Sequence, residues 1–140
     1  HPDSLMTMEV VKRAVLVVVN NLDGKFKKET VTKVRELVKS GAMIIDAGEE
    51  HEHKNSHVKG AVNIPLSQFR GRLDEIPKDQ PVYVHCRSSQ RSYNMVRALG
   101  QLGFENIYNI DGSFLGISEY EYFNDVTLNR DPIVTEYNFN

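Results

Sequence analysis

Between residues 81 and 93 the chain reads Pro81-Val82-Tyr83-Val84-His85-Cys86-Arg87-Ser88-Ser89-Gln90-Arg91-Ser92-Tyr93, and the fold can be worked out from this segment. It begins as an apolar run, passes through a small loop flanked by arginines, and continues in a pattern typical of a helix. A thiol between the carboxyl end of a strand and the amino end of a helix has a lowered pKa and is a candidate nucleophile. We therefore expect Cys86, the only cysteine, to be the reactive group.

Short apolar runs alternate with helical patterns on both sides of this segment. The runs predict strands at 43–46, 61–64, 82–85 and 107–110. The intervening patterns predict helices at 31–38 (Thr32 as N-cap, Ser40-Gly41 as the end), at 67–76, at 88–101 with Gly103 in a left-handed C-cap, and from Asp111-Gly112 to about Phe123. This alternation indicates an α/β domain, with a central, mainly parallel sheet of about five strands and helices on both faces. Ligand sites in such sheets lie beyond the carboxyl ends of the strands, where Cys86 falls.

Composition divides the chain into three parts. Residues 1–24 form a valine-rich extension or linker whose pattern suits a strand or a helix equally well. Residues 25–123 form the α/β domain, and residues 124–140 form a tail that we expect to pack on it as a surface strap.

Length and charge exclude several classes of protein. A chain of 140 residues with 40% hydrophobic content suits one core, and a net charge of −2 implies no general affinity for nucleic acid. The longest apolar run, 14–19, is far shorter than the roughly 20 residues of a membrane span. A lone cysteine and the absence of a signal-peptide pattern favour the cytoplasm.

The loop from Cys86 to Arg91 has six residues. A turn this short, at the start of a helix, points backbone N–H groups inward and forms a nest for an anion near the thiol. Arg87 and Arg91 add positive charge that favours the thiolate, and Ser88, Ser89 and Ser92 add hydroxyl donors. The alternative is a buried structural cysteine. The two arginines argue against the apolar environment that such a cysteine requires.

A second segment strengthens the interpretation. Asp46 ends a strand, and His57-Val58-Lys59-Gly60-Ala61-Val62-Asn63-Ile64-Pro65-Leu66 follows after a polar segment. With the cysteine loop, these residues resemble the rhodanese homology domain over about residues 26–122. That family has an aspartate after a strand, then His-x-x-Gly-Ala-x-Asn-Ile-Pro, then Cys-Arg-Ser-Gly-x-Arg-Ser.

The resemblance implies a sulfurtransferase. Cys86 takes sulfane sulfur from thiosulfate, a persulfide or a polysulfide, and passes the resulting persulfide sulfur to a thiol or another acceptor. Because the chain has no second cysteine, an acceptor thiol comes from outside it. The resemblance also assigns roles by position: Arg87, Ser88, Ser89, Gln90 and Arg91 cradle the persulfide and the donor's anionic group, and Asp46 and His57 are architectural supports.

Two other functions remain open. One is a non-catalytic binding or regulatory module with the same fold. The other is a phosphatase or arsenate reductase, whose Cys-x5-Arg loop carries one more residue; Ser92 stands there in this chain. A phosphatase also needs a general acid, for which Asp46 and Asp111 are the candidates.

The chain departs from the family pattern at four positions. Ser89 stands where the loop usually has glycine, which costs about 1 kcal/mol if the position needs a positive φ. Gly48 stands where the family often has an arginine, so that one expected ion pair is missing. Ser113 and Tyr120 lie where many relatives have Gly-Gly and a tryptophan.

The ends of the chain carry a further resemblance. His1-Pro2, Asn20-Asn21-Leu22-Asp23-Gly24-Lys25 and the tail from Ile133 to Phe139 are similar to coenzyme A disulfide reductases and related NADH oxidases with a fused rhodanese domain. This implies a carboxyl-terminal module of such a flavin disulfide reductase, with residues 5–22 forming a helix of its dimerisation domain. FAD, NAD(P)H and coenzyme A would belong to the larger protein, because this chain has no glycine-rich dinucleotide fingerprint.

One cluster offers a metal site as an alternative to a solvated loop. His51, His53 and His57 alternate with acidic residues, but nothing else completes a ligand set. We therefore expect a solvated loop and no metal.

Overall fold

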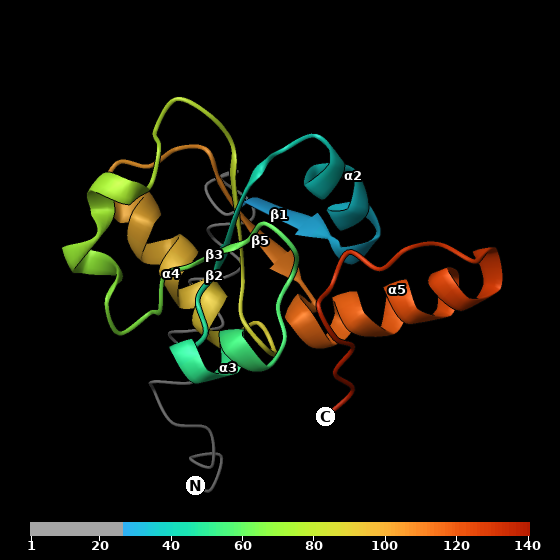
Figure 1. The fold of residues 1–140 in the computed structure, drawn as a ribbon. Coiled ribbons are helices and arrows are strands. Elements are labelled where there is room, and N and C mark those ends of the chain that lie inside the picture. Colours follow the sequence, from blue (N-terminus) through green and yellow to red (C-terminus); the bar gives the residue numbers. More distant parts are fainter. Residues whose placement is uncertain (1–26) are drawn as a thin grey trace, which may run out of the picture.

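The computed structural model describes residues 27–140, which form a five-stranded parallel sheet with helices on both faces (Figure 1). The predicted fold class is therefore confirmed. The expectations for residues 1–24 lie outside the described residues. In chain order the elements are β1 (Lys27–Thr30), η2 (Val31–Lys33), α2 (Val34–Lys39), β2 (Met43–Asp46), α3 (Glu50–Asn55), β3 (Val62–Asn63), η3 (Phe69–Gly71), η4 (Leu73–Glu75), β4 (Val82–His85), α4 (Gln90–Gln101), β5 (Ile107–Asp111) and α5 (Ser113–Leu128).

Strand β4 lies in the middle of the sheet, whose order is β1-β5-β4-β2-β3. Its neighbours are β2, with Asp46 paired to His85, and β5, with Val84 paired to Asn109. Because Cys86 directly follows β4, it lies at the centre of the carboxyl edge of the sheet. This is the edge where ligand sites of parallel sheets occur.

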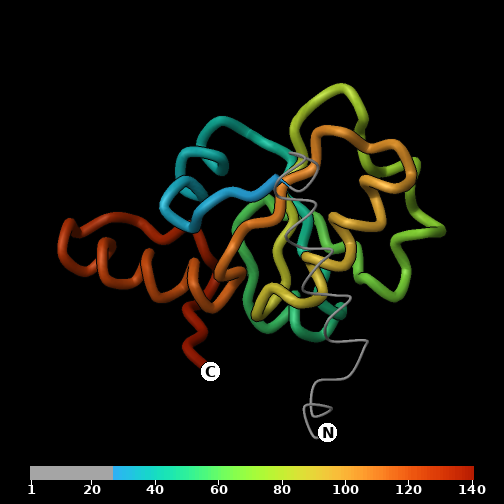
Figure 2. Tube along the Cα trace, turned by 180° about the vertical axis from the view of Figure 1, so that it is seen from behind, coloured from blue at the N-terminus to red at the C-terminus, as the bar shows by residue number. Residues whose placement is uncertain are grey.

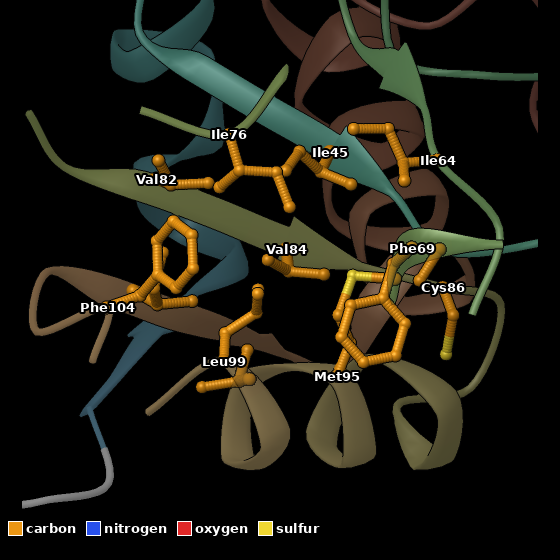
Figure 3. Close-up of a cluster of buried hydrophobic side chains, with 13 residues drawn as sticks. Ile45, Ile64, Phe69, Ile76, Val82, Val84, Cys86, Met95, Leu99 and Phe104 are labelled. Atoms are coloured by element: carbon orange, nitrogen blue, oxygen red, sulfur yellow. The ribbon is translucent and has the colours of Figure 1, made fainter. Parts of the chain in front are cut away.

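Two apolar cores cover the two faces of the sheet. Successive side chains of a strand point to opposite faces, so Ile44 and Ile45 enter different cores. On one face, Met95 and Leu99 of α4 pack on the sheet together with Phe69 (Figure 3). On the other face lie α2 and α5, seen together on one side of the molecule in Figures 1 and 2.

Strands were predicted more accurately than helices. Thr32 is not an N-cap, because residues 31–33 form a 3-10 turn in which its hydroxyl contacts that of Thr30 at 2.6 Å, and α2 begins only at Val34. The predicted helix at 67–76 is wrong: two separate 3-10 turns, η3 and η4, occupy this segment. The apolar pair Phe69 and Leu73 suited a helix, but Gly71 between them favours a break.

Residues 50–55, which were expected to lie in a solvated loop, form the helix α3. Its start is a capping box: Glu49 accepts from the backbone N–H of Glu52, and the Glu52 side chain accepts from the backbone N–H of Glu49 at 2.8 Å. The cap satisfies N–H groups that are otherwise unpaired at a helix start. The polar composition hid the helix, since it provides no apolar stripe.

Helix α5 runs five residues past its expected end, to Leu128, where Asn129 adopts a left-handed conformation (φ +54°) that suits a C-cap. It therefore crosses the predicted boundary between residues 123 and 124. None of the helices within residues 27–140 is long and apolar enough to cross a membrane.

The tail after α5 turns back along the domain (Figures 1 and 2). It is more than a surface strap, because Ile133 and Val134 are buried in the second core. Val134 forms an antiparallel bridge with Val58, and Thr135 N–H donates to the His57 carbonyl at 2.9 Å. We call residues 131–140 the carboxyl-terminal strap.

A buried charge cluster joins α2, α5 and the strap. The Arg35 guanidinium donates to Glu121 at 2.8 Å and to Asp125 at 2.7 Å, and Arg130 donates to Asp125 at 3.1 Å. Tyr137 of the strap donates to the other Asp125 oxygen at 2.6 Å. These contacts hold the strap on the same side of the sheet as α5. The charge cluster comprises Arg35, Glu121, Asp125 and Arg130.

Candidate active site

Cys86 lies where β4 gives way to the loop before α4, as the sequence predicts. Its Sγ accepts the backbone N–H of Ser89 at 3.1 Å. Figure 3 shows Cys86 at the end of the apolar cluster, next to Phe69. The residue is only 1% exposed, so its environment is more apolar than its two flanking arginines indicated.

The loop reverses direction at Ser89, whose φ is +86°. The structure confirms that this position needs the left-handed conformation, for which glycine carries no steric cost. Serine at this position makes two hydrogen bonds that glycine could not make. Its hydroxyl accepts the N–H of Gly112 at 3.1 Å and donates to the Ser113 hydroxyl at 3.1 Å. A glycine would relieve the backbone but would lose both contacts.

Ser113, the first residue of α5, is the centre of the hydroxyl network. It is fully buried, and its Oγ accepts the N–H of Cys86 at 3.1 Å and lies 3.9 Å from the cysteine sulfur. Ser92 Oγ lies 3.4 Å from the same hydroxyl. The sequence analysis singled out Ser113 only as a departure from a pattern. A signal was present, since Asp111 ends β5, the strand adjacent to β4, and Ser113 follows two residues later.

The pKa of the Cys86 thiol lies below its usual value, as expected. Burial raises it, and hydrogen bonds outweigh burial: the backbone and hydroxyl of Ser92, the backbone of Ser88 and the hydroxyl of Ser113 lower it. Neutral donors, rather than the charges of Arg87 and Arg91, are thus the largest causes of the lowering. Such donors favour the thiolate without forming an ion pair with it.

Arg91 is paired with a carboxylate and also interacts electrostatically with Cys86. Its two terminal nitrogens donate to the two oxygens of Glu52 on α3, at 2.6 and 2.9 Å. The bidentate hydrogen bond from Arg91 lowers the pKa of Glu52 to about 2, and the Glu52 carboxylate raises the pKa of Arg91. Sequence reasoning missed Glu52 because it placed this residue in a loop. The pair connects the start of α4 to α3.

Asp46 and His57 are connected to each other through His53. One Asp46 oxygen accepts the N–H of Gly48 at 2.9 Å, and the other lies 2.9 Å from Nδ1 of His53. His57 stacks on His53 with ring centroids 4.1 Å apart, and its Nδ1 donates to the His53 carbonyl at 2.7 Å. The arginine that the family often has two residues after the aspartate is replaced here by Gly48, and His53 contacts the Asp46 carboxylate instead.

The remaining loop residues differ in their surroundings. Ser88 and Gln90 are exposed, and the Gln90 amide lies 3.5 Å from Asn94. Arg87 donates to the Asn138 side-chain oxygen of the strap at 3.3 Å. Arg87 also lines a small cleft at this edge of the sheet, whose other lining residues are Asp46, Gly48, Glu52, Ser56 and Phe114.

His85, the last residue of β4, is also buried beside the loop. Its Nδ1 donates to the Cys86 carbonyl at 3.0 Å, and burial lowers the pKa of its imidazole. Neutral His85 therefore adds no charge beneath the thiol. Within residues 27–140, no three His, Cys, Asp or Glu side chains are placed to hold a metal ion.

Comparison with known families decides the identity of the domain. The family model of the rhodanese-like domain matches residues 30–120, which include β2, β4, the cysteine loop and Ser113. The chain belongs to the rhodanese-like family.

Relatives of this rhodanese-like chain include proteins named for sulfur transfer. It is 44% identical over 73 residues to the uncharacterized protein YqhL of Bacillus subtilis, covering 52% of this chain and 58% of YqhL. It is 29% identical over 91 residues to the thiosulfate sulfurtransferase GlpE of Haemophilus influenzae, covering 65% of this chain and 87% of GlpE.

Two solved structures of larger proteins share the rhodanese-like fold. One is reduced CoADR-RHD of Bacillus anthracis, with a TM-score of 0.65 and 30% identity over 82% of this chain and 19% of that protein. The other is an NAD-dependent persulfide reductase from A. fulgidus, with a TM-score of 0.57 and 32% identity over 72% of this chain and 18% of that protein. This chain thus spans about three fifths of YqhL and under a fifth of either larger protein.

Proposed function

We propose that this rhodanese-like domain is a sulfurtransferase in which Cys86 carries sulfur as a persulfide. The observation that carries the proposal is the set of neutral donors around the cysteine sulfur, which includes the Ser89 N–H at 3.1 Å and the backbone and hydroxyl of Ser92. The match to the rhodanese-like family and the similarity to GlpE support it. The loop residues Arg87, Ser88, Ser89, Gln90 and Arg91 frame the persulfide, and Asp46 and His57 support the loop.

The reaction has two displacements at sulfur. The Cys86 thiolate attacks the sulfane sulfur of a donor such as thiosulfate, a persulfide or a polysulfide. A bond forms between Sγ and that sulfur, the donor's sulfur–sulfur bond breaks, and the leaving group departs with the electron pair; from thiosulfate it is sulfite. An acceptor thiolate then attacks the outer sulfur of the persulfide, and the Cys86 thiolate is regenerated.

The loop contributes by stabilising negative charge on sulfur throughout. Sγ is anionic before the first attack, and the outer sulfur of the persulfide is anionic afterwards. Inward-pointing N–H and hydroxyl groups stabilise both states without moving, which is the advantage of a preorganised polar site. Because Cys86 is buried, side chains around the cleft must move when a donor enters, and Ser88 is the exposed side chain nearest to it in sequence.

The same burial favours a second candidate, a non-catalytic binding or regulatory module. In that case Cys86 is a core residue, the Arg91–Glu52 pair holds the loop closed, and no donor reaches the sulfur. The two functions differ in one measurable property, which is whether Cys86 accepts a sulfur atom.

The test is intact mass spectrometry after incubation with thiosulfate and, separately, with polysulfide. We expect one added sulfur atom, removed again by a small thiol and absent in Cys86→Ser. Ser88→Ala is a matched control in the same loop, since only its backbone contributes to the low pKa of the thiol. If no donor adds sulfur to the folded wild-type chain, the binding-module function replaces the proposal.

We further propose that the domain works beside a flavin disulfide reductase. The similarity to CoADR-RHD and to the persulfide reductase supports this arrangement, because the chain covers only 19% and 18% of those proteins. The reductase would hold FAD, NAD(P)H and coenzyme A and would reduce the persulfide sulfur. Pull-down with candidate reductases, or the sequence of the full gene product, tests the association.

A further inference from the structure

The two arginines of the cysteine loop have different partners: Arg91 faces a carboxylate, and Arg87 faces a neutral amide. The sequence motif alone does not show this difference. Arg91 is neutralised by Glu52 through two short hydrogen bonds. Arg87 donates to the neutral amide oxygen of Asn138 at 3.3 Å, and no carboxylate of residues 27–140 forms an ion pair with it. Arg87 is therefore the loop cation whose charge is available to a ligand.

Arg87 also follows Cys86 directly in the chain and faces a cleft at this edge of the sheet. It lines the cleft together with Asp46 and Glu52, and both of these carboxylates already have partners. Asp46 is held by His53 and the Gly48 N–H, and Glu52 by Arg91. An anion that enters the cleft therefore meets Arg87 as its uncommitted cationic contact.

Asn138 is fixed on three sides, so it can hold Arg87 in place. Its backbone N–H donates to the hydroxyl of Ser118, a fully buried residue of α5, at 3.2 Å. Its side-chain oxygen accepts the N–H of Asn140 at 3.1 Å as well as the Arg87 guanidinium. The strap around it is secured in turn by the Val58–Val134 bridge and by Tyr137 on Asp125.

Asn138 lies beyond residue 120, where the match to the rhodanese-like family ends. The contact with Arg87 is thus a property of the strap, added to the family's loop. An amide oxygen orients a guanidinium but leaves its charge intact, whereas a carboxylate in the same place would neutralise it. Glu52 is such a carboxylate, and it neutralises Arg91 in this way.

We propose that Asn138 is a positioning residue that holds Arg87 as an uncompensated cation at the entrance to Cys86, so that the site favours anionic sulfur donors. The part concerning sulfur donors rests on the proposed function. The part concerning the entry of anions to Cys86 does not, and it is tested with reagents that transfer no sulfur.

The experiment compares alkylation of Cys86 in the full chain by iodoacetate, an anion, and by iodoacetamide, its neutral analogue. The ratio of the two rates reports the charge that an incoming ligand meets, and the iodoacetamide rate reports the thiolate itself. The variants are Asn138→Asp, which neutralises Arg87, and Asn138→Ala, which releases it. Asn140→Asp is the matched control, because it adds the same charge two residues away on an exposed side chain.

We expect Asn138→Asp to lower the iodoacetate-to-iodoacetamide ratio on the order of tenfold, the effect of losing about one charge-assisted contact. Asn138→Ala lowers it by less, and Asn140→Asp leaves it within about a factor of two because its charge is screened by solvent. The iodoacetamide rate and its pH midpoint stay unchanged in all three variants. In sulfur uptake, Asn138→Asp raises the thiosulfate concentration needed for half-maximal rate and leaves the maximal rate unchanged.

Three results would overturn the inference. One is an equal ratio for Asn138→Asp and Asn140→Asp. Another is an equal loss of both alkylation rates, which indicates a merely structural role for Asn138. The third is no reaction of wild-type Cys86 with either reagent, since the inference requires a route past Arg87. If the ratio falls as expected and no donor adds sulfur, the entry of anions stands and the sulfurtransferase proposal fails.

Discussion

The surroundings of the Cys86 sulfur and the charge cluster both hold buried groups, but they stabilise negative charge in opposite ways. In the charge cluster, the carboxylates of Glu121 and Asp125 face the guanidinium of Arg35 at 2.8 and 2.7 Å. In the loop, the sulfur of Cys86 faces N–H and hydroxyl groups that carry no net charge.

The difference shows what each arrangement is suited for. A buried carboxylate paired with an arginine is stabilised strongly and has little tendency to react, and losing its partner is costly. A sulfur anion held by neutral dipoles keeps its charge for a reaction, and the same dipoles then hold the charge of the product. The predictions below change one arrangement at a time, in order of decreasing effect.

Arg35→Ala has the largest expected effect on the free energy of unfolding. It leaves Glu121 and Asp125 without their main partner, and breaking a buried ion pair costs about 3 kcal/mol or more. Urea unfolding measures the loss, and the pH midpoint of Cys86 alkylation stays unchanged. Arg72→Ala is the control: it breaks an exposed pair with Glu75, which solvent screens, and therefore changes the free energy of unfolding little. A similar loss of unfolding free energy in the two variants would contradict the expectation that the buried charge cluster stabilises the fold more than an exposed ion pair does.

Ser92→Ala and Ser113→Ala act on the loop instead. Each removes a hydroxyl whose hydrogen bond lowers the pKa of Cys86, so each raises that pKa. The pH dependence of the iodoacetamide rate measures the shift, with its midpoint moving to higher pH. Ser88→Ala leaves the midpoint in place because its hydroxyl is not a cause of the low pKa. A midpoint unchanged in all three variants would contradict the role of the hydroxyl groups.

Ser89 separates backbone strain from hydrogen bonding. Ser89→Gly and Ser89→Ala both lose the contacts to Gly112 and Ser113, but only glycine relieves the positive φ. The glycine variant should therefore be more stable than the alanine variant by about 1 kcal/mol. Thermal and urea unfolding of the pair measure this difference, and equal stability would show that serine adopts this conformation without cost.

The Glu52–Arg91 pair gives the smallest effect, and it depends on pH. Arg91 lowers the pKa of Glu52 from 4.5 to about 2, so the pair stabilises the fold above the usual pKa, and this contribution is lost as the pH falls towards 2. Both side chains are partly exposed, so solvent reduces the energy involved. Unfolding of Glu52→Gln between pH 5 and about 2 should show a flatter pH dependence than wild type. Parallel pH curves for the two proteins would contradict the assignment.

Local patterns in the sequence predicted the centre of the fold well. The runs at 43–46 and 82–85 match β2 and β4 to the residue, because apolar runs bounded by turns have few alternatives. Strand β1 was not predicted: it consists of Lys-Lys-Glu-Thr and is a strand only because it pairs with β5. Its stability comes from a partner distant in sequence, which a local pattern does not contain.

The candidate site shows the same limit. The place of Cys86 was predicted, and Ser89 was noted as standing where the loop usually has glycine, since motif and loop length depend on neighbouring residues. Ser113, Glu52 and Asn138 were missed as contacts of the loop, because each reaches it from another element of the fold. The two arginines of the loop were noted in the sequence. Their partners, Glu52 and Asn138, lie outside the motif, so the sequence did not show which arginine is neutralised.

The order of the strands has a consequence for how the chain is made. A ribosome releases β1 first, yet Lys27 pairs with Tyr108, so this strand waits for most of the domain to be synthesised before it finds its neighbour. Ser113, which completes the hydroxyl network, emerges later than the cysteine that it contacts. In a nascent chain, the contribution of the Ser113 hydroxyl to the low pKa of Cys86 is therefore missing until β5 and the start of α5 have docked. The full lowering of the thiol pKa thus depends on the docking of a segment that is synthesised after the cysteine itself.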